Sequence, residues 1–375
     1  MKISYSMAGM CVSAISIIFP TVAQAEDELK IKLGAHAFFD YENVEVGSAT
    51  PVDGTNLRLF RVDVGGSYGD YKFKSNFDLQ GDEVQIKDLF IEFGGDTKLR
   101  FGNFKVMNGL EQPSSLYATT FAEANSVTKV NGLGRKLGVA VFHSLDNVQL
   151  SGGIFSTDVN DTSDKDEWSI TGRVTTELHP GDKANQLHLG VSARYRENAD
   201  MALYGYSHKP FAKSAPTTVK TPKLTDSDTF IGLETAFVRD GFSLQSEYGL
   251  AQAECDLSVC STDPSFTSYY VDASYIWGGK RVLKKGMFSR TKIDRPASEG
   301  GKGAFQLAVR YDVADLNDGP IIGGRQESWV IGGTWYRDKY IRVMGNYSHS
   351  ELEDSPSYGN SSADAFVIRL QAELY

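Results

Sequence analysis

Basic side chains recur at every second position of several segments, and this spacing gathers them on one surface. In an extended strand, alternate side chains point to the same face. Arginine binds carboxylates and phosphates through two parallel hydrogen bonds, so such a face could bind anions. The basic residues on it are Arg61, Lys72, Lys74, Arg173, Arg194, Arg196, Arg310, Arg342 and Arg369. Carboxylates share the face, so pairing of each arginine with a neighbouring carboxylate is an equally open alternative: Asp63, Asp78, Glu92, Glu234, Glu247, Asp272 and Asp312.

Residues that would support catalysis or metal binding lack the required spacing. Six histidines occur, but no H-E-x-x-H pattern is present. Ser289 and Lys292 match S-x-x-K, a spacing that chance supplies in a chain of this composition, and the K-T-G partner is missing. We therefore predict that the protein is not an enzyme, and we predict no metal site, no cofactor and no nucleic-acid partner.

Sixteen segments alternate apolar and polar residues. They lie near 30–41, 56–68, 71–80, 84–93, 98–107, 136–145, 147–155, 167–177, 185–197, 228–240, 241–252, 266–277, 303–313, 326–337, 340–350 and 363–375. Many exceed the mean soluble strand of about 5–6 residues and suit a tilted strand crossing a bilayer, which needs about 9–11. Because lipid satisfies no backbone hydrogen bonds, spanning strands must close into a barrel. We predict an all-β fold, a closed antiparallel transmembrane β-barrel of about 16 strands.

The connections between these segments alternate between tight turns and long polar stretches. Tight turns fall at 69–70, 94–97, 145–147, 240–241 and 337–339, and long connections at 42–55, 108–135, 156–166, 198–227, 253–265, 314–325 and 351–362. Short periplasmic turns and long extracellular loops are typical of outer-membrane barrels. The segment 108–135 is long enough to fold inward as a constriction loop, with a plain surface loop as the alternative. Arg135 and Lys136 at its end are the best candidates for a ring of cations. The connection 278–302 is the exception, a long connection on the periplasmic side.

The first 25 residues read as a secretory signal peptide, with Lys2, an apolar stretch and the small-residue ending Ala23-Gln24-Ala25. Its removal leaves residues 26–375 as a single barrel domain with 37 basic and 48 acidic residues, a net charge of −11. Cys255 and Cys260 remain, and an oxidising compartment favours a disulfide between them over a metal site.

Composition excludes several other classes of protein. Aromatic residues make up 11% of the chain, which a disordered protein would lack. Three cysteines and 37 glycines among 375 residues exclude disulfide-dense and collagen-like chains. Beyond the leader, no apolar run is long enough for a membrane-spanning helix.

Several strings, in order and spacing, resemble the phosphate-selective porin O and P family. They are LRLFRVDVGG (57–66), YKFKSNFD (71–78), VQIKDLFIEF (84–93), RFGNFK (100–105), GRKLGV (134–139), GAFQLAVRY (303–311) and GGTWY (332–336). The resemblance implies a homotrimer of sixteen-stranded barrels, with Arg61, Lys72, Lys74, Arg135, Lys136 and Arg310 on an anion path. It also implies a long periplasmic connection before the strand near 303. The chain departs from the family pattern at Leu116 and Ala124, where the family carries cations.

We therefore predict an outer-membrane porin for passive diffusion of small anions such as phosphate or polyphosphate. The predicted partners are small inorganic anions, outer-membrane lipid and lipopolysaccharide, and two further copies of the chain. Two alternatives stay open at this point: a weakly selective general porin, and a plugged barrel that acts as a surface binding or structural protein.

Overall fold

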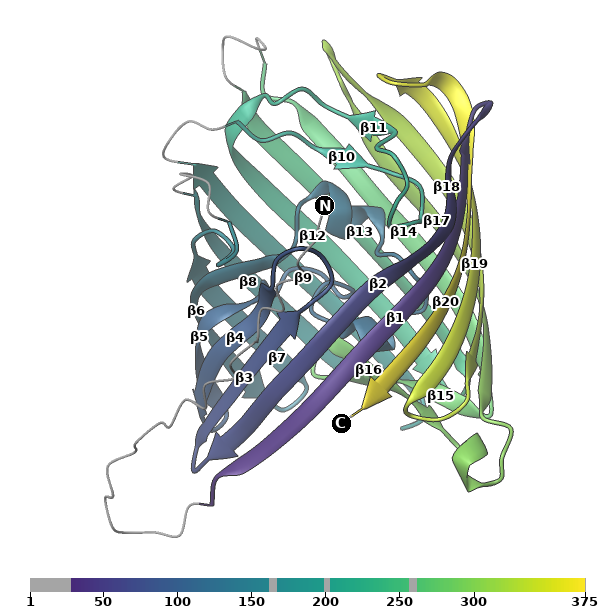
Figure 1. The fold of residues 1–375 in the computed structure, drawn as a ribbon. Helices are drawn as coiled ribbons and strands as arrows, with labels where there is room; N and C mark the ends of the chain where they lie inside the picture. Colours follow the sequence, from purple (N-terminus) through teal and green to yellow (C-terminus); the bar gives the residue numbers. More distant parts are fainter. Residues whose placement is uncertain (1–27, 162–166, 199–202, 256–261, 375) are drawn as a thin grey trace, which may run out of the picture.

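A closed barrel of sixteen antiparallel strands forms the molecule (Figure 1). The computed structural model describes residues 28–161, 167–198, 203–255 and 262–374, so the predicted signal peptide, 1–25, lies outside the described residues. The barrel strands are β1 (Lys30–Val46), β2 (Ala49–Tyr68), β3 (Tyr71–Asp78), β4 (Gln85–Gly94), β5 (Thr97–Lys105), β6 (Arg135–Leu145), β7 (Val148–Phe155), β8 (Glu167–Leu178), β9 (Gln186–Asn198), β12 (Thr225–Arg239), β13 (Phe242–Cys255), β14 (Ser265–Trp277), β17 (Ala304–Asp318), β18 (Ile321–Tyr336), β19 (Ile341–Ser355) and β20 (Gly359–Leu374). β1 pairs with β20 and closes the ring. This confirms the predicted fold class.

Alternation of side chains explains the two faces of the wall. In β17, Phe305 and Leu307 are 47% and 55% exposed on the outer surface, whereas Gln306 and Arg310 are buried on the inner side. A bilayer reverses the usual arrangement, because the apolar face turns toward lipid and the polar face toward the lumen. Among the described residues, no helix has the length and apolar character to cross a membrane.

Three of the predicted extracellular loops are wrong, because the strands continue through them. Only the turn at 47–48 separates β1 from β2, so most of the predicted loop 42–55 is strand. The predicted loops 314–325 and 351–362 are likewise mostly occupied by the ends of β17 to β20. In these stretches the outer face is mostly polar, and the apolar side chains lie on the inner face, where Val44, Val46 and Leu352 pack against the inserted segments. The alternation of an apolar outer face therefore does not reveal the strands beyond the bilayer.

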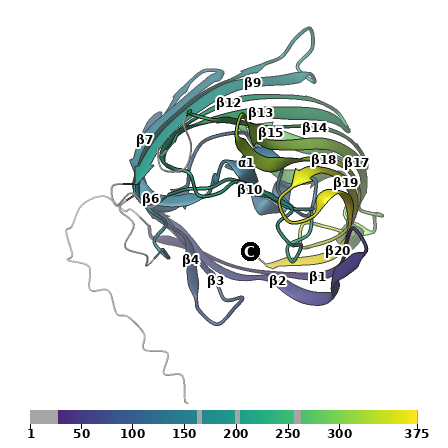
Figure 2. The ribbon, with the colours of Figure 1, turned by 90° about the horizontal axis from the view of Figure 1, so that it is seen from above.

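Three segments that connect barrel strands fold into the lumen (Figure 2). The first, residues 106–134, joins β5 to β6 and holds η1 (Leu116–Ala118) and α1 (Ser126–Val130). The second precedes β12 and carries the short pair β10 (Ser207–His208) and β11 (Val219–Lys220). The third is a hairpin of β15 (Gly279–Lys284) and β16 (Met287–Ile293), which lies within the predicted periplasmic connection 278–302.

Candidate functional site

The segment 106–134, which we call the constriction segment, is bonded to the side of the barrel formed by β13 to β20. The fully buried Arg310 of β17 donates to Glu111 of this segment at 2.6 Å and to Asp272 of β14 at 2.6 and 2.8 Å. The backbone N–H groups of Leu110 and Glu111 donate to Glu247 of β13 at 2.9 and 2.8 Å. Further bonds run from the backbone N–H groups of Ser126 and Ala122 to Asp312 and Asn346.

A second anchor of the constriction segment is Glu123, a buried carboxylate among three cations. Arg58 of β2 donates to it at 3.0 Å, Arg369 of β20 donates at 3.2 Å, and Lys129 of α1 lies at 3.6 Å. Burial alone would raise the pKa of Glu123, but the attraction of Arg58, Lys129 and Arg369 outweighs burial and holds this pKa well below its usual range. The carboxylate therefore stays charged and ties the segment to β2 and β20, the strands on either side of β1.

Open space between the constriction segment and the barrel wall lies against β2 to β6. A cavity of about 250 Å³ there is bounded by the barrel wall on one side and by Pro113, Ser115, Leu116 and Tyr117 of the constriction segment on the other. Its lining carries five cations and two carboxylates: Arg61, Lys74, Arg100, Lys105, Arg135, Asp63 and Asp88. A wider space of about 660 Å³ adjoins it on the periplasmic side and shares Asp63, Lys74, Ser115 and Tyr117 with it.

Most cations of this cavity are paired with carboxylates. Asp88 of β4 accepts from Lys74 of β3 and from Arg135 of β6, each at 2.7 Å. Arg61 of β2 pairs with Asp78 at 3.0 Å. Because each carboxylate cancels part of a neighbouring positive charge, the local field is weaker than the number of cations alone implies.

Lys105 differs from its neighbours, because carbonyl groups are its partners. Its Nζ donates to the backbone oxygens of Gln112 and Ser114, each at 2.7 Å, and within the described part of the chain no carboxylate lies within 4.0 Å. Lys105 immediately precedes the constriction segment, holds it through these two carbonyls and also lines the cavity. Sequence reasoning missed Lys105, the last residue of β5. Gly102, three residues earlier, has a φ of +134°, which disrupts the alternation of side chains and so hides the face on which Lys105 lies.

Four of the predicted anion-path residues lie apart from this cavity, in buried ion pairs. Arg173 of β8 pairs with Glu234 at 2.8 Å. Arg194 and Arg196 of β9 share Asp228 of β12, at 3.0 and 2.6 Å. Arg310 pairs with Asp272 and Glu111, as described above. In these four cases the arginine is paired with a lumen carboxylate, which was the alternative to an anion-binding role.

The two other predicted residues also lie outside the cavity lining. Lys136 is bonded to Glu167 at the start of β8. Lys72 is exposed near the periplasmic end of β3, and it has no ion pair with any residue that the structure describes. The structure thus brings together Arg61, Lys74 and Arg135, and adds Arg100 and Lys105 to them. No cluster of metal-ligating side chains occurs in the described ranges.

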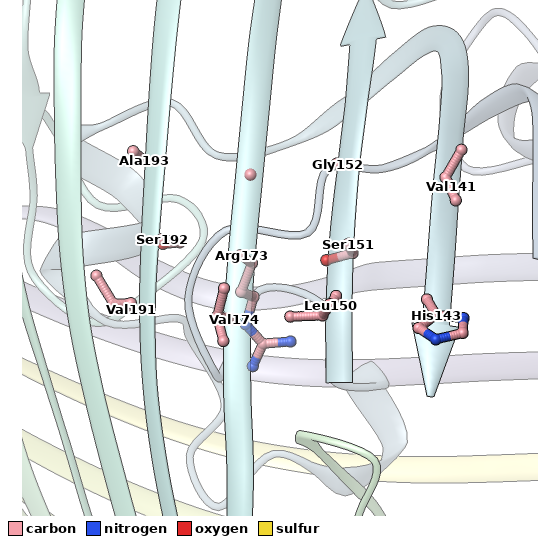
Figure 3. A pocket seen from close by; sticks show the side chains of 11 residues that line it. Val141, His143, Leu150, Ser151, Gly152, Arg173, Val174, Val191, Ser192 and Ala193 are labelled. Carbon is pink, nitrogen blue, oxygen red and sulfur yellow. The ribbon is translucent and has the colours of Figure 1, made fainter. Parts of the chain in front are cut away.

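A separate hollow of about 510 Å³ lies on the outer wall over β6 to β9 (Figure 3). Its floor is a row of small residues in register, Gly152, Gly172 and Ala193, and it is flanked by the outward side chains of Val174 and Val191. Both glycines lack a positive φ, and an added Cβ would meet nothing closer than 3.6 Å. This hollow faces away from the lumen and is no part of the passage.

The sequence matches the family described as "Phosphate-selective porin O and P" over residues 29–374. The chain belongs to this family. The porin is also 27% identical over 331 residues to an "Uncharacterized protein" of Caulobacter vibrioides, in an alignment that covers 83% of the porin and 66% of that relative.

Several solved structures share the fold of the porin at low sequence identity. An anion-selective porin from Comamonas acidovorans superposes with a TM-score of 0.62 at 12% identity, over 92% of the porin and all of that chain. The outer membrane channel DcaP of Acinetobacter baumannii gives 0.59 at 11% identity, over 94% and 99%. OmpT of Vibrio cholerae in a trimer form gives 0.56 at 12% identity, over 93% and 100%.

Family and fold together confirm the prediction of an outer-membrane porin, a channel for small solutes and not an enzyme. The predicted resemblance to the porin O and P family is confirmed as well. Cys255 is disulfide-bonded, but Cys260 lies outside the described residues, so the Cys255–Cys260 pairing stays a prediction.

Proposed function

We propose that the porin admits small inorganic anions, phosphate among them, through the cavity between the constriction segment and β2 to β6. The observation that carries this proposal is the lining of five cations and two carboxylates in the cavity between the constriction segment and the barrel wall. Every ion that crosses there meets Arg61, Lys74, Lys105 and Arg135 at close range, and charge at a constriction selects ions by sign. Lys72 serves as an approach residue on the periplasmic side. The likeness to an anion-selective porin supports this proposal at the level of the fold.

The preference for anions is expected to be moderate. Asp88 and Asp78 pair with three of the cations, and hydrophobic or uncharged groups stand at Leu116 and Ala124, where the family carries cations. Conduction also requires that an ion binds weakly enough to leave. We infer that Asp63, Asp78 and Asp88 limit how tightly an anion is held, whereas Arg173, Arg194, Arg196 and Arg310 brace the lumen.

Two adjacent cations provide a matched test of this function. Arg135→Gln is expected to lower the anion preference, because Arg135 lines the cavity, whereas Lys136→Gln is expected to leave it unchanged, because Lys136 is bonded to Glu167 outside the lining. Reversal potentials in planar bilayers under a potassium chloride gradient measure both. A native channel that prefers cations would refute the proposed function, and equal shifts in the two variants would refute the assignment of Arg135.

We further infer that the porin assembles as a homotrimer in the outer membrane, where it contacts lipid and lipopolysaccharide. Small residues on the outer wall, Ala35, Ala37 and Gly172, allow neighbouring barrels to approach closely, whereas the ring of Phe73 covers the small residue Gly66. The trimer form of OmpT supports this assembly by likeness of fold. The expected result is a mass of three chains for the unheated protein in mild detergent, by light scattering with the detergent contribution subtracted. A mass of one chain under those conditions would contradict the inference.

A further inference from the structure

The hairpin β15–β16 crosses the lumen beneath the constriction segment and contacts it directly. Leu283 and Phe288 are buried against Leu110 and Ala118 of that segment. The backbone N–H of Phe288 donates to Ser114 Oγ at 3.0 Å. The hairpin therefore supports the constriction segment at Leu110, Ser114 and Ala118. Other residues of the same segment are bonded to the β13–β20 side of the barrel.

The tip of the hairpin is a two-residue turn that docks on β8. Lys285 and Gly286 both have positive φ, 53° and 70°, as in a type I′ turn. The N–H of Gly286 donates to Glu177 Oε1 at 2.8 Å, and its carbonyl accepts from Arg173 Nη2 at 2.7 Å. A Cβ at position 286 would lie 2.7 Å from Thr175 Oγ1, so a glycine is needed for this contact as long as the Thr175 hydroxyl is present.

Arg173 is itself held rigidly, which makes it a fixed point for the tip. Its Nε donates to Glu234 at 2.8 Å, and both side chains are buried. Midway along β16, Arg290 is paired with Glu373 of β20 and lies over the ring of Tyr117 in the constriction segment. The hairpin is thus fastened to opposite sides of the barrel and supports the constriction segment between them.

We propose that Arg173 and Glu177 are positioning residues: they hold the Gly286 tip, and through the β15–β16 hairpin they set the position of the constriction segment. They touch no passing ion, because neither lines the narrow cavity. This inference rests on the proposed function, because the constriction segment that Arg173 and Glu177 position is one wall of the proposed passage. When the tip is released, the lower surface of residues 110–118 loses its support and the passage widens toward the periplasm.

Glu177→Ala tests this arrangement, with Glu177→Gln as the matched control. A glutamine oxygen still accepts the Gly286 N–H, so the control keeps the hydrogen bond and removes the charge. The first readout is independent of conduction: the rate at which a membrane-impermeant thiol reagent modifies Ser115→Cys, measured against the same protein without that substitution. We expect Glu177→Ala to raise this rate on the order of tenfold, as for the loss of one hydrogen bond to a charged group, and Glu177→Gln to leave it unchanged.

A reversible tether separates positioning from electrostatics. Thr175→Cys and Gly286→Cys place two sulfurs within reach across the docking contact. In the Glu177→Ala background without the position-115 reporter, oxidation is expected to return conductance and open-channel noise to native values, and reduction is expected to raise both again. Unchanged labelling and conductance in Glu177→Ala would overturn the proposal, as would a tether without effect. A channel that lacks anion preference would overturn the proposed function alone, because the labelling rate still reports the hairpin.

Discussion

Replacing Asp88 by asparagine is expected to raise the anion preference of the channel about fivefold. Asp88 accepts from Lys74 and Arg135 at 2.7 Å each, so a single carboxylate cancels part of the charge of two cations in the cavity. One unit of charge a few ångströms from a passing ion contributes about 1 kcal/mol at a dielectric constant near that of water, which is a factor of about five. In Asp88→Asn both cations are free to face an ion in the cavity, so the attraction for an anion increases there.

Reversal potentials under a salt gradient measure this change, and block of the chloride current by phosphate measures anion affinity. Phosphate is expected to block the Asp88→Asn channel at lower concentration than the native one. Asp240→Asn is the matched control, because it makes the same chemical change at an exposed periplasmic turn, where the φ of 50° suits asparagine. Equal selectivity in the native and Asp88→Asn channels would show that Asp88 does not control the passage.

The sixteen strands were predictable because the bilayer imposes one rule on all of them. A spanning strand must be apolar toward lipid at every second residue, and β17 shows this with Phe305, Leu307 and Val309 outside and Arg310 inside. The rule ends where the bilayer ends. In the upper parts of β1 and β2 the outer face is polar and the apolar residues Val44 and Val46 lie on the inner face, so the outward apolar alternation is lost although the strand pairing continues to Val46 and Ala49.

The pairing of lumen charges was not predictable, because alternation gives the face of a residue but not its neighbour on the next strand. Arg196 lies opposite Asp228 only in the register that β9 and β12 adopt, and Arg194 reaches the same carboxylate. No tight turn fixes that register, because a long segment that contains β10 and β11 separates β9 from β12. For the same reason, alternation did not predict the ion pairs of Lys74 and Arg135 with Asp88, which join three strands.

The inward hairpin was predicted only as a long periplasmic connection. Its buried residues, Leu283 and Phe288, are two apolar positions among lysines, a pattern equally compatible with an exposed hairpin outside the barrel. What places it in the lumen is the docking of Gly286 on Glu177 and Arg173, and these residues lie more than a hundred positions earlier in the chain. Contacts across such distances leave no local signal.

Replacing Glu123 by glutamine is expected to loosen the constriction segment and to destabilise the folded barrel by about 3 kcal/mol. Removing one partner from a buried ion pair leaves the other charge uncompensated, which typically costs about 3–5 kcal/mol. Here Arg58 and Lys129 would lose their carboxylate, whereas Arg369 would keep its second partner, Asp40, at 2.7 Å. Because Arg58 stands on β2, the segment would lose its ion pair to that strand and keep only the bond from Arg369 of β20 to the Ala122 carbonyl, so single-channel conductance and its fluctuations are both expected to rise.

The depressed pKa of Glu123 fixes the pH range of this effect. A carboxyl group whose pKa is lowered on folding contributes its full stabilisation above its unfolded pKa of about 4.3, and the contribution is lost as pH falls through the folded value. Native and Glu123→Gln channels should therefore differ in conductance and in unfolding temperature from neutral pH to about pH 5, and should converge only in stronger acid. Glu353→Gln is the matched control, since Glu353 is 64% exposed and lies 3.9 Å from Arg325 on the outer wall. If Glu123→Gln unfolds at the native temperature and conducts as the native channel does at pH 7, Glu123 does not anchor the constriction segment.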